Sequence, residues 1–405
     1  MKYGQVGGYG SVPERKRFGV VIGIIVFIII VFGFGGFLYY KFIYSANAIK
    51  VLLDRTFDYL EDVVDNSDYD SVVNEFEAQL NLKSSNKEEN EVLKVFNKID
   101  FSGSYGIDYD RNIMSLDVDS NYDDKDLGGV NFYAEYGRGY IYLDNLYDKY
   151  IDYSIDNYSE LFERKTADTK SIVIGIRKAI KKALRDEYFS VEKVIIDNES
   201  VTKTTMDLSG KNYQLFTEDV VKILLEDKSF LESYANVLKK EVEDVKKIFN
   251  DLVANSKDSK GEKYVLYTKK FDFVKFEVMA EDSKFILENN NKEYGYEYYE
   301  DTVKVMFGSF ELKETKDNAG TLKFSYYDDE DFGIEIMVDV VSNRDVEVKE
   351  KDVTNSISAE KLTEDDVNKI YNNLLKNEGI VAIKDELVKL FNTDTDENDL
   401  PVIMS

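Results

Sequence analysis

The longest uncharged stretch of the chain, residues 18–40, restricts the fold more than any other feature. As a helix this stretch would be about 34 Å long, enough to cross the roughly 30 Å hydrocarbon core of a bilayer. A cleavable signal peptide has a shorter apolar region of about 7–15 residues, although Ala46-Asn47-Ala48 offers a small-residue cleavage site downstream. We therefore expect an uncleaved signal-anchor, a transmembrane helix over 18–40.

The residues on either side of this stretch predict its orientation. Basic residues near a membrane span stay on the cytoplasmic side, and here they precede the span as Lys2, Arg15, Lys16 and Arg17, against Glu14 alone. We expect a single-pass protein of the bacterial cell membrane, with residues 1–17 cytoplasmic and the C-terminal part extracellular. Gly19 and Gly23 form a GxxxG pair, which is either a helix–helix contact or ordinary glycine usage in a membrane helix.

Composition excludes several kinds of chemistry. The 405 residues include no Cys and no His, so disulfides, cysteine nucleophiles, thiolate metal sites and a Ser-His-Asp triad cannot form. The formal net charge of −27 repels nucleic acid. The chain is 43% hydrophobic, with 30 Tyr and 25 Phe, which is enough apolar material for a core without disulfides.

Hydrophobic periodicity predicts an α+β protein. Residues 46–65 repeat apolar side chains at helical spacing, and residues 101–109 and 114–122 alternate them at strand spacing around the turn DRNI. Residues 66–90 are polar, and NLKSSNKEEN at 81–90 predicts a loop. The remaining predictions are a short helix at 91–99, helical blocks at 158–187 and 216–255, two strands between those blocks, strands across 262–350, and helices at 363–376 and 379–391.

These elements define the expected domains. We expect membrane-proximal helices and a loop at 41–100, an extracellular α+β domain at 101–391, and a disordered tail at 392–405. Two antiparallel meanders, each followed by helices, indicate either one large curved sheet or an internal duplication with halves 101–215 and 216–391.

Three motifs are candidates for metal or catalytic chemistry, and none of them nominates a site. DYDRNIMSLDVD at 108–119 spaces its first acidic residues like a calcium loop, but Ile113 stands where glycine is needed and Asp119 where glutamate is needed. DTDEND at 394–399 is acidic but too close to the end of the chain. Carboxylates are numerous enough that a glycosidase-like pair would occur by chance. We name no catalytic, cofactor-binding or metal residue, and we expect no cofactor and no enzyme.

Two further stretches allow a structural and a binding interpretation. Residues 171–186 form a basic amphipathic helix, whose cations either meet acidic neighbours within the domain or contact an anionic envelope polymer or lipid headgroups. The tyrosines at 294, 296, 298 and 299 either pack across strands or form a ligand platform. In both cases the structural interpretation is the simpler one.

The arrangement resembles uncharacterised single-pass membrane-anchored proteins of AT-rich Gram-positive bacteria. The stretch that carries the resemblance is VEKVIIDNESVTKTTMDLSGKNYQLFTEDVVKILLEDKSFL at 191–231, a threonine-rich strand followed by a helix rich in Leu and Lys. The exterior part in turn is similar to LolA-like lipoprotein carriers, so the resemblance implies a curved, half-barrel-like antiparallel sheet around helices. It implies no site residues.

The expected function follows from this resemblance. It implies a membrane-anchored extracellular binding protein that holds an apolar or lipid-like ligand between sheet and helices, or that binds an envelope protein partner. A structural or assembly protein of the envelope without a ligand is the alternative, and a carboxylate-based hydrolase is the least favoured. A carrier would have a connected apolar cavity, whereas a structural protein would have a filled core.

Overall fold

The computed structural model describes residues 48–392, apart from 68, 164–165, 270–271, 291–292, 315–317 and 329–331. The chain divides into two compact units, each built from two segments. Unit 1 takes in Met1–Asp65 and Ala167–Val274, and unit 2 takes in Asn66–Thr166 and Lys275–Ser405. The predicted tail at 392–405 lies, after its first residue, outside the described part of the chain.

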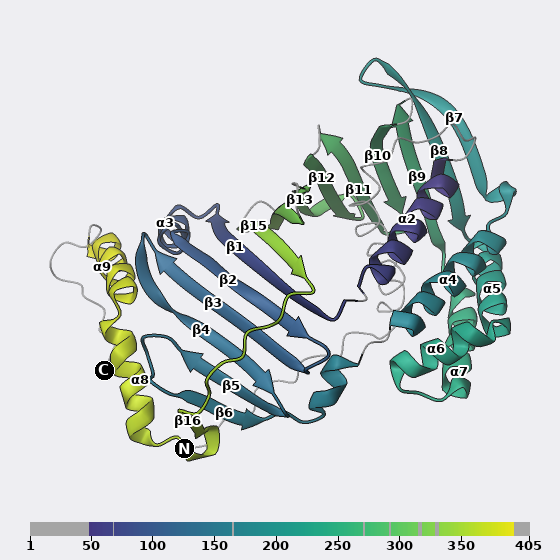
Figure 1. The fold of residues 1–405 in the computed structure, drawn as a ribbon. Coiled ribbons are helices and arrows are strands. Elements are labelled where there is room, and N and C mark those ends of the chain that lie inside the picture. The colour runs from purple at the N-terminus through teal and green to yellow at the C-terminus, as the bar shows by residue number, and fades with distance from the viewer. Residues whose placement is uncertain are drawn as a thin grey trace, which may run out of the picture. The chain divides into compact units, whose positions relative to one another are not determined.

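Unit 2 is built around an antiparallel sheet (Figure 1). Its strands follow one another in the hydrogen-bonded order β16-β6-β5-β4-β3-β2-β1-β15-β14-β13-β12-β11, and only the β16–β6 pair is parallel. The strands of the first segment are β1 (Ser71–Ser84), β2 (Ile99–Asp108), β3 (Ile113–Tyr122), β4 (Lys125–Glu135), β5 (Arg138–Leu143) and β6 (Tyr150–Ser154). Those of the second are β11 (Ser283–Asn290), β12 (Glu293–Glu300), β13 (Val303–Glu314), β14 (Ala319–Asp328), β15 (Phe332–Arg344) and β16 (Ser356–Ser358).

Strand β1 joins the two segments of unit 2. It pairs with β2 on one side and with β15 on the other, and the β15 register runs from Val72↔Arg344 to Ser84↔Phe332. The predicted loop at 81–90 is therefore wrong over most of its length, because residues 81–84 belong to β1 and a helix begins at Lys87. The side chains of Phe76, Leu80 and Leu82 alternate with polar ones, which is the strand period of two.

The α-helices of unit 2 lie before β2 and after β16, and a 3₁₀ turn follows β6. They are α3 (Lys87–Phe96), α8 (Glu364–Lys376) and α9 (Glu378–Asn392), together with the 3₁₀ turns η1 (Tyr158–Phe162) and η3 (Ala359–Lys361). Asn86 caps α3, and Thr363 and Asp366 form a capping box at the start of α8. The predicted C-terminal helices at 363–376 and 379–391 are thus confirmed to within a residue.

Unit 1 packs helices together with a short run of strands. Its helices are α2 (Ala48–Asp65), α4 (Thr166–Ala183), α5 (Lys211–Glu226), α6 (Lys228–Leu238) and α7 (Val242–Ser256), with the 3₁₀ turn η2 (Asp186–Tyr188). Strands β9 (Gly261–Lys269), β8 (Glu199–Ser209) and β7 (Phe189–Ile196) pair in that order. The helix core is centred on Phe230, which is 1% exposed and contacts Phe249 with ring centroids 5.6 Å apart.

Strand β10 (Asp272–Met279) carries the chain from unit 1 into unit 2. The described residues thus hold sixteen strands in a mostly antiparallel arrangement, together with eight α-helices. This corrects the predicted fold, a half-barrel-like sheet behind an N-terminal transmembrane helix. The α+β class is consistent with the structure, but the sheet is larger than predicted because β1 joins two strand runs that the sequence pattern presents as separate meanders.

The membrane prediction also needs correction. Among the described helices, none combines the length and the apolar character that crossing a bilayer requires. Helix α2 is 18 residues long but carries charged residues along its length, as its sequence AIKVLLDRTFDYLEDVVD shows. The predicted span at 18–40 lies outside the described residues, so the structure does not support a transmembrane, single-pass protein.

Candidate functional site

One face of the unit 2 sheet carries a row of small and polar side chains. Cross-strand register aligns Gly295 of β12 with Ser309, Ser309 with Ser325, Ser325 with Glu335, and Glu335 with Asn81. Directly opposite residues in an antiparallel sheet share a face. Four consecutive strands, β12 to β15, and the sequence-distant β1 therefore contribute to one continuous row.

This row forms the floor of a groove of about 710 Å³. That volume lies within the roughly 300–1,000 Å³ that is typical of ligand pockets. The groove is lined by Gln79, Asn81, Glu293, Gly295, Phe307, Gly308, Ser309, Glu311, Lys323, Phe324, Ser325, Tyr327, Glu335, Ile336 and Met337. We call it the sheet groove.

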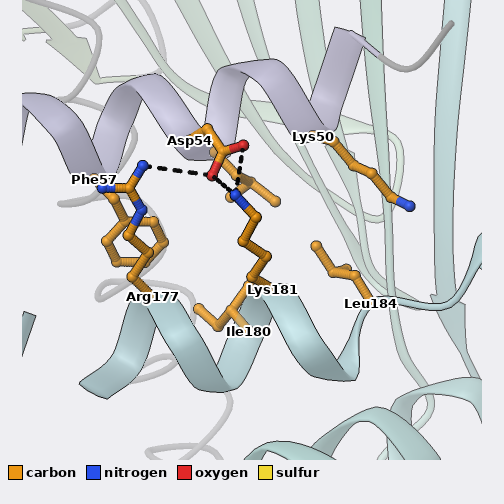
Figure 2. Close-up of a pocket in the computed structure, with 8 residues that line it drawn as sticks. Lys50, Asp54, Phe57, Arg177, Ile180, Lys181 and Leu184 are labelled. Atoms are coloured by element: carbon orange, nitrogen blue, oxygen red, sulfur yellow. Dashed lines mark hydrogen bonds and ion pairs between the residues drawn. The ribbon is translucent and has the colours of Figure 1, made fainter. Parts of the chain in front are cut away.

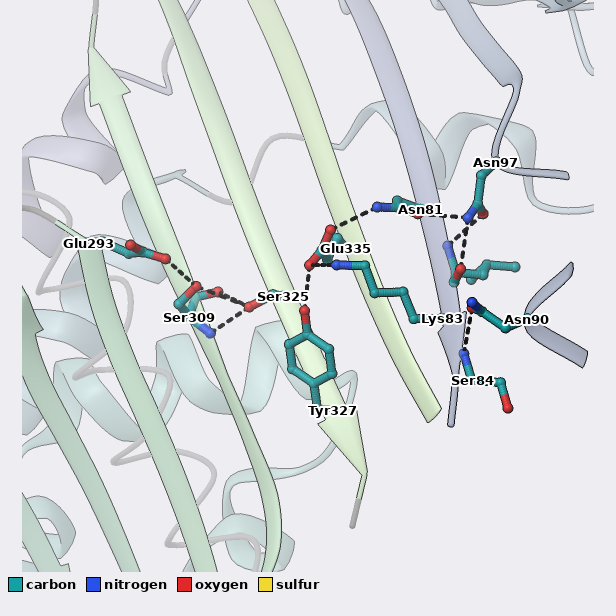
Figure 3. A network of polar contacts seen from close by, with 11 residues as sticks. Asn81, Lys83, Ser84, Asn90, Asn97, Glu293, Ser309, Ser325, Tyr327 and Glu335 are labelled. Atoms are coloured by element: carbon teal, nitrogen blue, oxygen red, sulfur yellow. Dashed lines mark hydrogen bonds and ion pairs between the residues drawn. The ribbon is translucent and has the colours of Figure 1, made fainter. Parts of the chain in front are cut away.

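Glu335 is the centre of the hydrogen-bond network at one end of the groove (Figure 3). Its Oε1 accepts hydrogen bonds from the Tyr327 hydroxyl and from Lys83 Nζ, and its Oε2 accepts one from Asn81 Nδ2 at 2.9 Å. Asn81 Oδ1 in turn accepts from Asn97 Nδ2 at 2.7 Å, and Asn97 also bonds both backbone groups of Leu82. The network therefore fixes the groove wall to the loop after α3.

The protonation of these groups follows from the same contacts. Burial alone would raise the pKa of Glu335, but the hydrogen bonds from Lys83 and Tyr327 outweigh it and lower that pKa below 4.5. Burial and the bond to Glu335 raise the pKa of Tyr327, and the bond to Glu335 raises the pKa of Lys83. Glu335 is thus an ionised acceptor with settled partners, not a carboxylic acid available for proton transfer.

Two serines and a glutamate form the middle of the groove (Figure 3). The Ser309 hydroxyl donates to Glu293 Oε1 at 2.7 Å and lies 3.0 Å from the Ser325 hydroxyl, which also accepts from the Ser309 backbone N–H at 2.8 Å. A hydroxyl both donates and accepts, so this pair can exchange partners with a hydroxyl-bearing ligand.

Aromatic rings stand beside this polar floor. Phe307 and Tyr327 lie opposite each other on β13 and β14, with centroids 5.1 Å apart and planes 15° from parallel. Lys304 Nζ lies 4.7 Å from the Phe307 centroid and Lys83 Nζ lies 6.0 Å from the Tyr327 centroid. Because stacking and ammonium groups occupy the ring faces, the pair acts as a rigid wall and not as a stacking platform.

A second, smaller pocket lies between α2 and α4 in unit 1 (Figure 2). Its volume is about 220 Å³, and Leu53, Phe57, Ile180 and Leu184 line it together with Lys50, Asp54, Arg177 and Lys181. Lys181 Nζ and Arg177 Nη2 both approach Asp54, at 3.1 and 3.6 Å. The pocket is below the usual ligand size, and ion pairs to Asp54 occupy the charged part of its lining.

The basic helix predicted at 171–186 corresponds to α4 and η2. Its cations meet acidic neighbours of unit 1: Lys178 with Asp227 at 2.7 Å, Lys181 with Asp54 at 3.1 Å, Arg185 with Asp219 at 2.6 Å, and Arg177 with Asp58 and Glu61 at 2.7 and 2.8 Å. The apolar face packs into the helix core through Ile172, Ile176 and Ala179. The structural interpretation of this stretch is therefore confirmed.

The calcium-like stretch at 108–119 is the predicted hairpin of β2 and β3. Asp108 accepts from the backbone N–H and side chain of Arg111, at 2.9 and 2.8 Å, so its oxygens already have partners. No group of acidic residues in the described part of the chain is arranged to hold a metal ion. The acidic stretch at 394–399 lies outside the described residues.

The tyrosines of β12 pack within the sheet. Tyr294 and Tyr296 are 5% and 7% exposed, and they stack on Phe310 and Phe324 with centroids 5.2 and 6.1 Å away. Burial raises the pKa of Tyr294 to about 12. Cross-strand packing is thus confirmed for these two residues, and they are not a ligand platform.

Sequence reasoning missed the sheet groove entirely. Asn81 and Glu335 are 254 residues apart, and Ser309 and Ser325 belong to strands that the sequence predicts only as a run across 262–350. The signal that could have indicated the groove is the polar half of the β1 alternation, Glu75, Glu77, Gln79, Asn81 and Lys83.

Comparisons with known proteins add no family. No protein-family model and no curated protein matches the chain. Among solved structures, the translocator domain of the autotransporter NalP from Neisseria meningitidis is similar over 73% of this chain and 96% of that one. Its sequence identity is 8% and its TM-score 0.14, so this likeness carries no argument about fold or function.

Proposed function

We propose that this chain is a non-enzymatic binding protein and that its sheet groove binds a neutral, hydroxyl-rich ligand such as a segment of carbohydrate. The observation that supports the proposal is a groove of about 710 Å³ whose polar lining is preorganised by hydrogen bonds. A preorganised lining loses little conformational entropy when a ligand binds.

The charge of the groove favours a neutral ligand. Its lining holds three carboxylates and one ammonium group, Lys323. Each carboxylate has a partner: Glu335 pairs with Lys83, Glu311 with Lys313, and Glu293 accepts from Ser309. The excess of carboxylates repels an anion, and their existing partners leave a cation little to gain, so a neutral ligand fits best. Hydroxyl groups can donate to Glu293 and accept from Ser325, which matches the mixed lining.

The absence of catalysis in this proposal rests on the state of Glu335. A carboxyl group that acts as general acid near neutral pH needs a raised pKa, whereas the pKa of Glu335 is lowered. The Ser309 hydroxyl donates to the Glu293 carboxylate at 2.7 Å, and the chain holds no His, the usual base that activates a serine nucleophile.

Binding to a panel of neutral oligosaccharides, measured by saturation-transfer NMR and titration calorimetry on the full chain, tests the proposal. Ser325→Tyr fills the groove floor and should abolish binding. The matched control is Thr321→Tyr, which adds the same ring to the same face of β14 outside the lining. The proposal fails if no saccharide binds, or if Ser325→Tyr and Thr321→Tyr bind equally well.

The ligand and partner implied by the resemblance remain predictions. The pocket between α2 and α4, at about 220 Å³, is small for a lipid-like ligand, and half of its lining residues are charged. Native mass spectrometry of the purified chain would decide the matter, because a carrier should retain lipid or take up added lipid. The predicted extracellular localisation also remains a prediction.

A further inference from the structure

Strand β7 ends the strand order of the described residues and pairs only with β8. The two strands form a tight hairpin, in which Ile196 lies opposite Glu199 and the connecting Asp197 and Asn198 have φ of 50° and 63°. Two left-handed residues in a two-residue loop define a type I′ turn. In such a hairpin the residues that flank the loop exchange both of their backbone hydrogen bonds.

The hairpin geometry fixes which backbone groups of β7 are free to bind another strand. Because narrow hydrogen-bonded pairs alternate along an antiparallel ladder, the even-numbered residues of β7 bond to β8 and the odd-numbered ones point outward. The pairing of β8 with β9 agrees with this assignment. Gly210 N–H donates to Lys260 O at 2.7 Å, so the backbone groups of even-numbered β8 residues point to β9, and those of odd-numbered β8 residues point to the even-numbered residues of β7. The outward residues are Phe189, Val191, Lys193 and Ile195.

The side chains of these outward residues share one face of the sheet. Val191 and Ile195 are 50% and 77% exposed, which is unusual for apolar residues of a strand, and the exposed Lys193 lies between them. A bare edge with exposed apolar side chains is the kind of template that accepts a further strand.

We propose that the β7 edge binds an extended peptide segment by strand addition. The added strand would pair its backbone with the outward N–H and C=O groups of β7, as in other cases of β-augmentation. Its side chains would meet Val191, Lys193 and Ile195 in turn, so the preferred peptide has the pattern apolar–x–acidic–x–apolar. The pattern reads the same in both directions and therefore suits a parallel or an antiparallel strand.

A second copy of this chain fits the edge less well than a peptide. Two identical edges pair about an axis normal to the sheet, so residues of the same face lie opposite one another. Two registers give the longest overlap between two antiparallel β7 strands. In one of them Lys193 lies opposite Lys193 of the second copy, and in the other Glu192 lies opposite Glu192 of the second copy. Like charges directly opposite each other destabilise a strand pair.

The test uses the full chain and a capped seven-residue peptide, Thr-Val-Thr-Glu-Thr-Val-Thr. We expect binding by calorimetry, and slower hydrogen exchange at the amides of Val191, Lys193 and Ile195 but not at those of the even-numbered neighbours. Val191→Pro removes one outward N–H while leaving the β8 pairing, a position where an edge strand tolerates proline. This variant should weaken binding at least tenfold.

Charge reversal supplies a test that does not depend on proline. Lys193→Glu should lower affinity for the glutamate peptide about two- to fivefold and raise it for the same peptide with lysine in place of glutamate. The matched control is Lys247→Glu, the same change of charge at an exposed residue of α7, which should leave both affinities unchanged. The proposal is overturned if the peptide does not bind, if Val191→Pro binds as well as the unchanged chain, or if sedimentation shows that β7 pairs with a second copy instead.

Discussion

The exchange Asn81→Asp with Glu335→Gln tests the network that fixes the sheet groove. In the folded chain Glu335 Oε1 faces two donors, Tyr327 and Lys83, while its Oε2 faces the Asn81 amide. Glu335→Gln keeps the size of the side chain but replaces one oxygen with an NH₂ group. In one orientation of that amide its NH₂ group faces Lys83 Nζ, and in the other it faces Asn81 Nδ2, so a donor meets a donor in both.

The expected cost can be worked out from these contacts. A hydrogen bond to a charged group contributes about 1.5–3 kcal/mol when it is buried. Here the side chains of Glu335 and Lys83 are 34% and 46% exposed, so water can replace part of the loss and the ion pair itself is worth less than about 1 kcal/mol. We expect Glu335→Gln to lower the free energy of unfolding by about 1–2 kcal/mol.

The second substitution should repair the first. Asn81→Asp alone places two carboxylates side by side and should also destabilise the fold, by about 1 kcal/mol. In the double variant the new carboxylate at position 81 accepts from the glutamine NH₂ and can still accept from Asn97, so this variant should recover more than half of the summed loss. The coupling energy should therefore exceed about 1 kcal/mol, well above the roughly 0.3–0.5 kcal/mol typical of independent sites.

Urea denaturation of the four proteins measures this coupling. Glu75→Gln, a change at an exposed carboxylate on the same strand and face as Asn81, is the control and should change the free energy of unfolding by less than about 0.5 kcal/mol. If the losses of the two single variants simply add in the double variant, the hydrogen bonds around Glu335 do not organise the groove and the preorganisation argument fails.

Three further predictions concern stability elsewhere. Burial raises the pKa of Glu277, but hydrogen bonds from Lys284 and Lys275 outweigh this effect and lower that pKa below 4.5. The ionised Glu277 therefore stabilises the fold above pH 4.5, and this stabilisation is lost as the pH falls through the lower pKa of the folded chain. Glu277→Gln should consequently make the free energy of unfolding less dependent on pH in the acid range. Gly261 has φ of 67° and an added Cβ would lie 2.1 Å from a backbone oxygen of β8, so Gly261→Ala should cost about 2–3 kcal/mol, measured by urea denaturation. Arg177→Met leaves three carboxylates of α2 without their shared cation and should lower the melting temperature more at low than at high salt; an equal drop at both would contradict this.

The elements with strong local signals could be predicted from the sequence. The hairpin of β2 and β3 is expected at 101–109 and 114–122, and its strands occupy Ile99–Asp108 and Ile113–Tyr122. Helix α2 is expected at 46–65 and occupies Ala48–Asp65. In each case one face is apolar at a single clear period, and the turn DRNI separates the two strands of the hairpin.

The pairing of strands could not be predicted in the same way. The register of β1 with β15 joins residues more than 240 positions apart, from Val72↔Arg344 to Ser84↔Phe332. Local patterns show that a strand exists but not which strand lies beside it, since many alternating segments could pair. That register brings Gln79 and Asn81 to the groove that β12 to β15 form, so no local motif could have nominated the complete site.

The failure at β1 and the position of the groove have one physical cause. A strand that buries one face and leaves the other open needs polar residues at every second position, and when those are Glu, Asn and Lys the segment reads as a loop. The open face is also where Asn81 and Lys83 meet Glu335 and where Gln79 lines the groove. Local sequence preference was therefore least informative at β1, the strand whose polar side chains line the groove. Such a mismatch between local preference and the fold is expected where residues serve a binding surface.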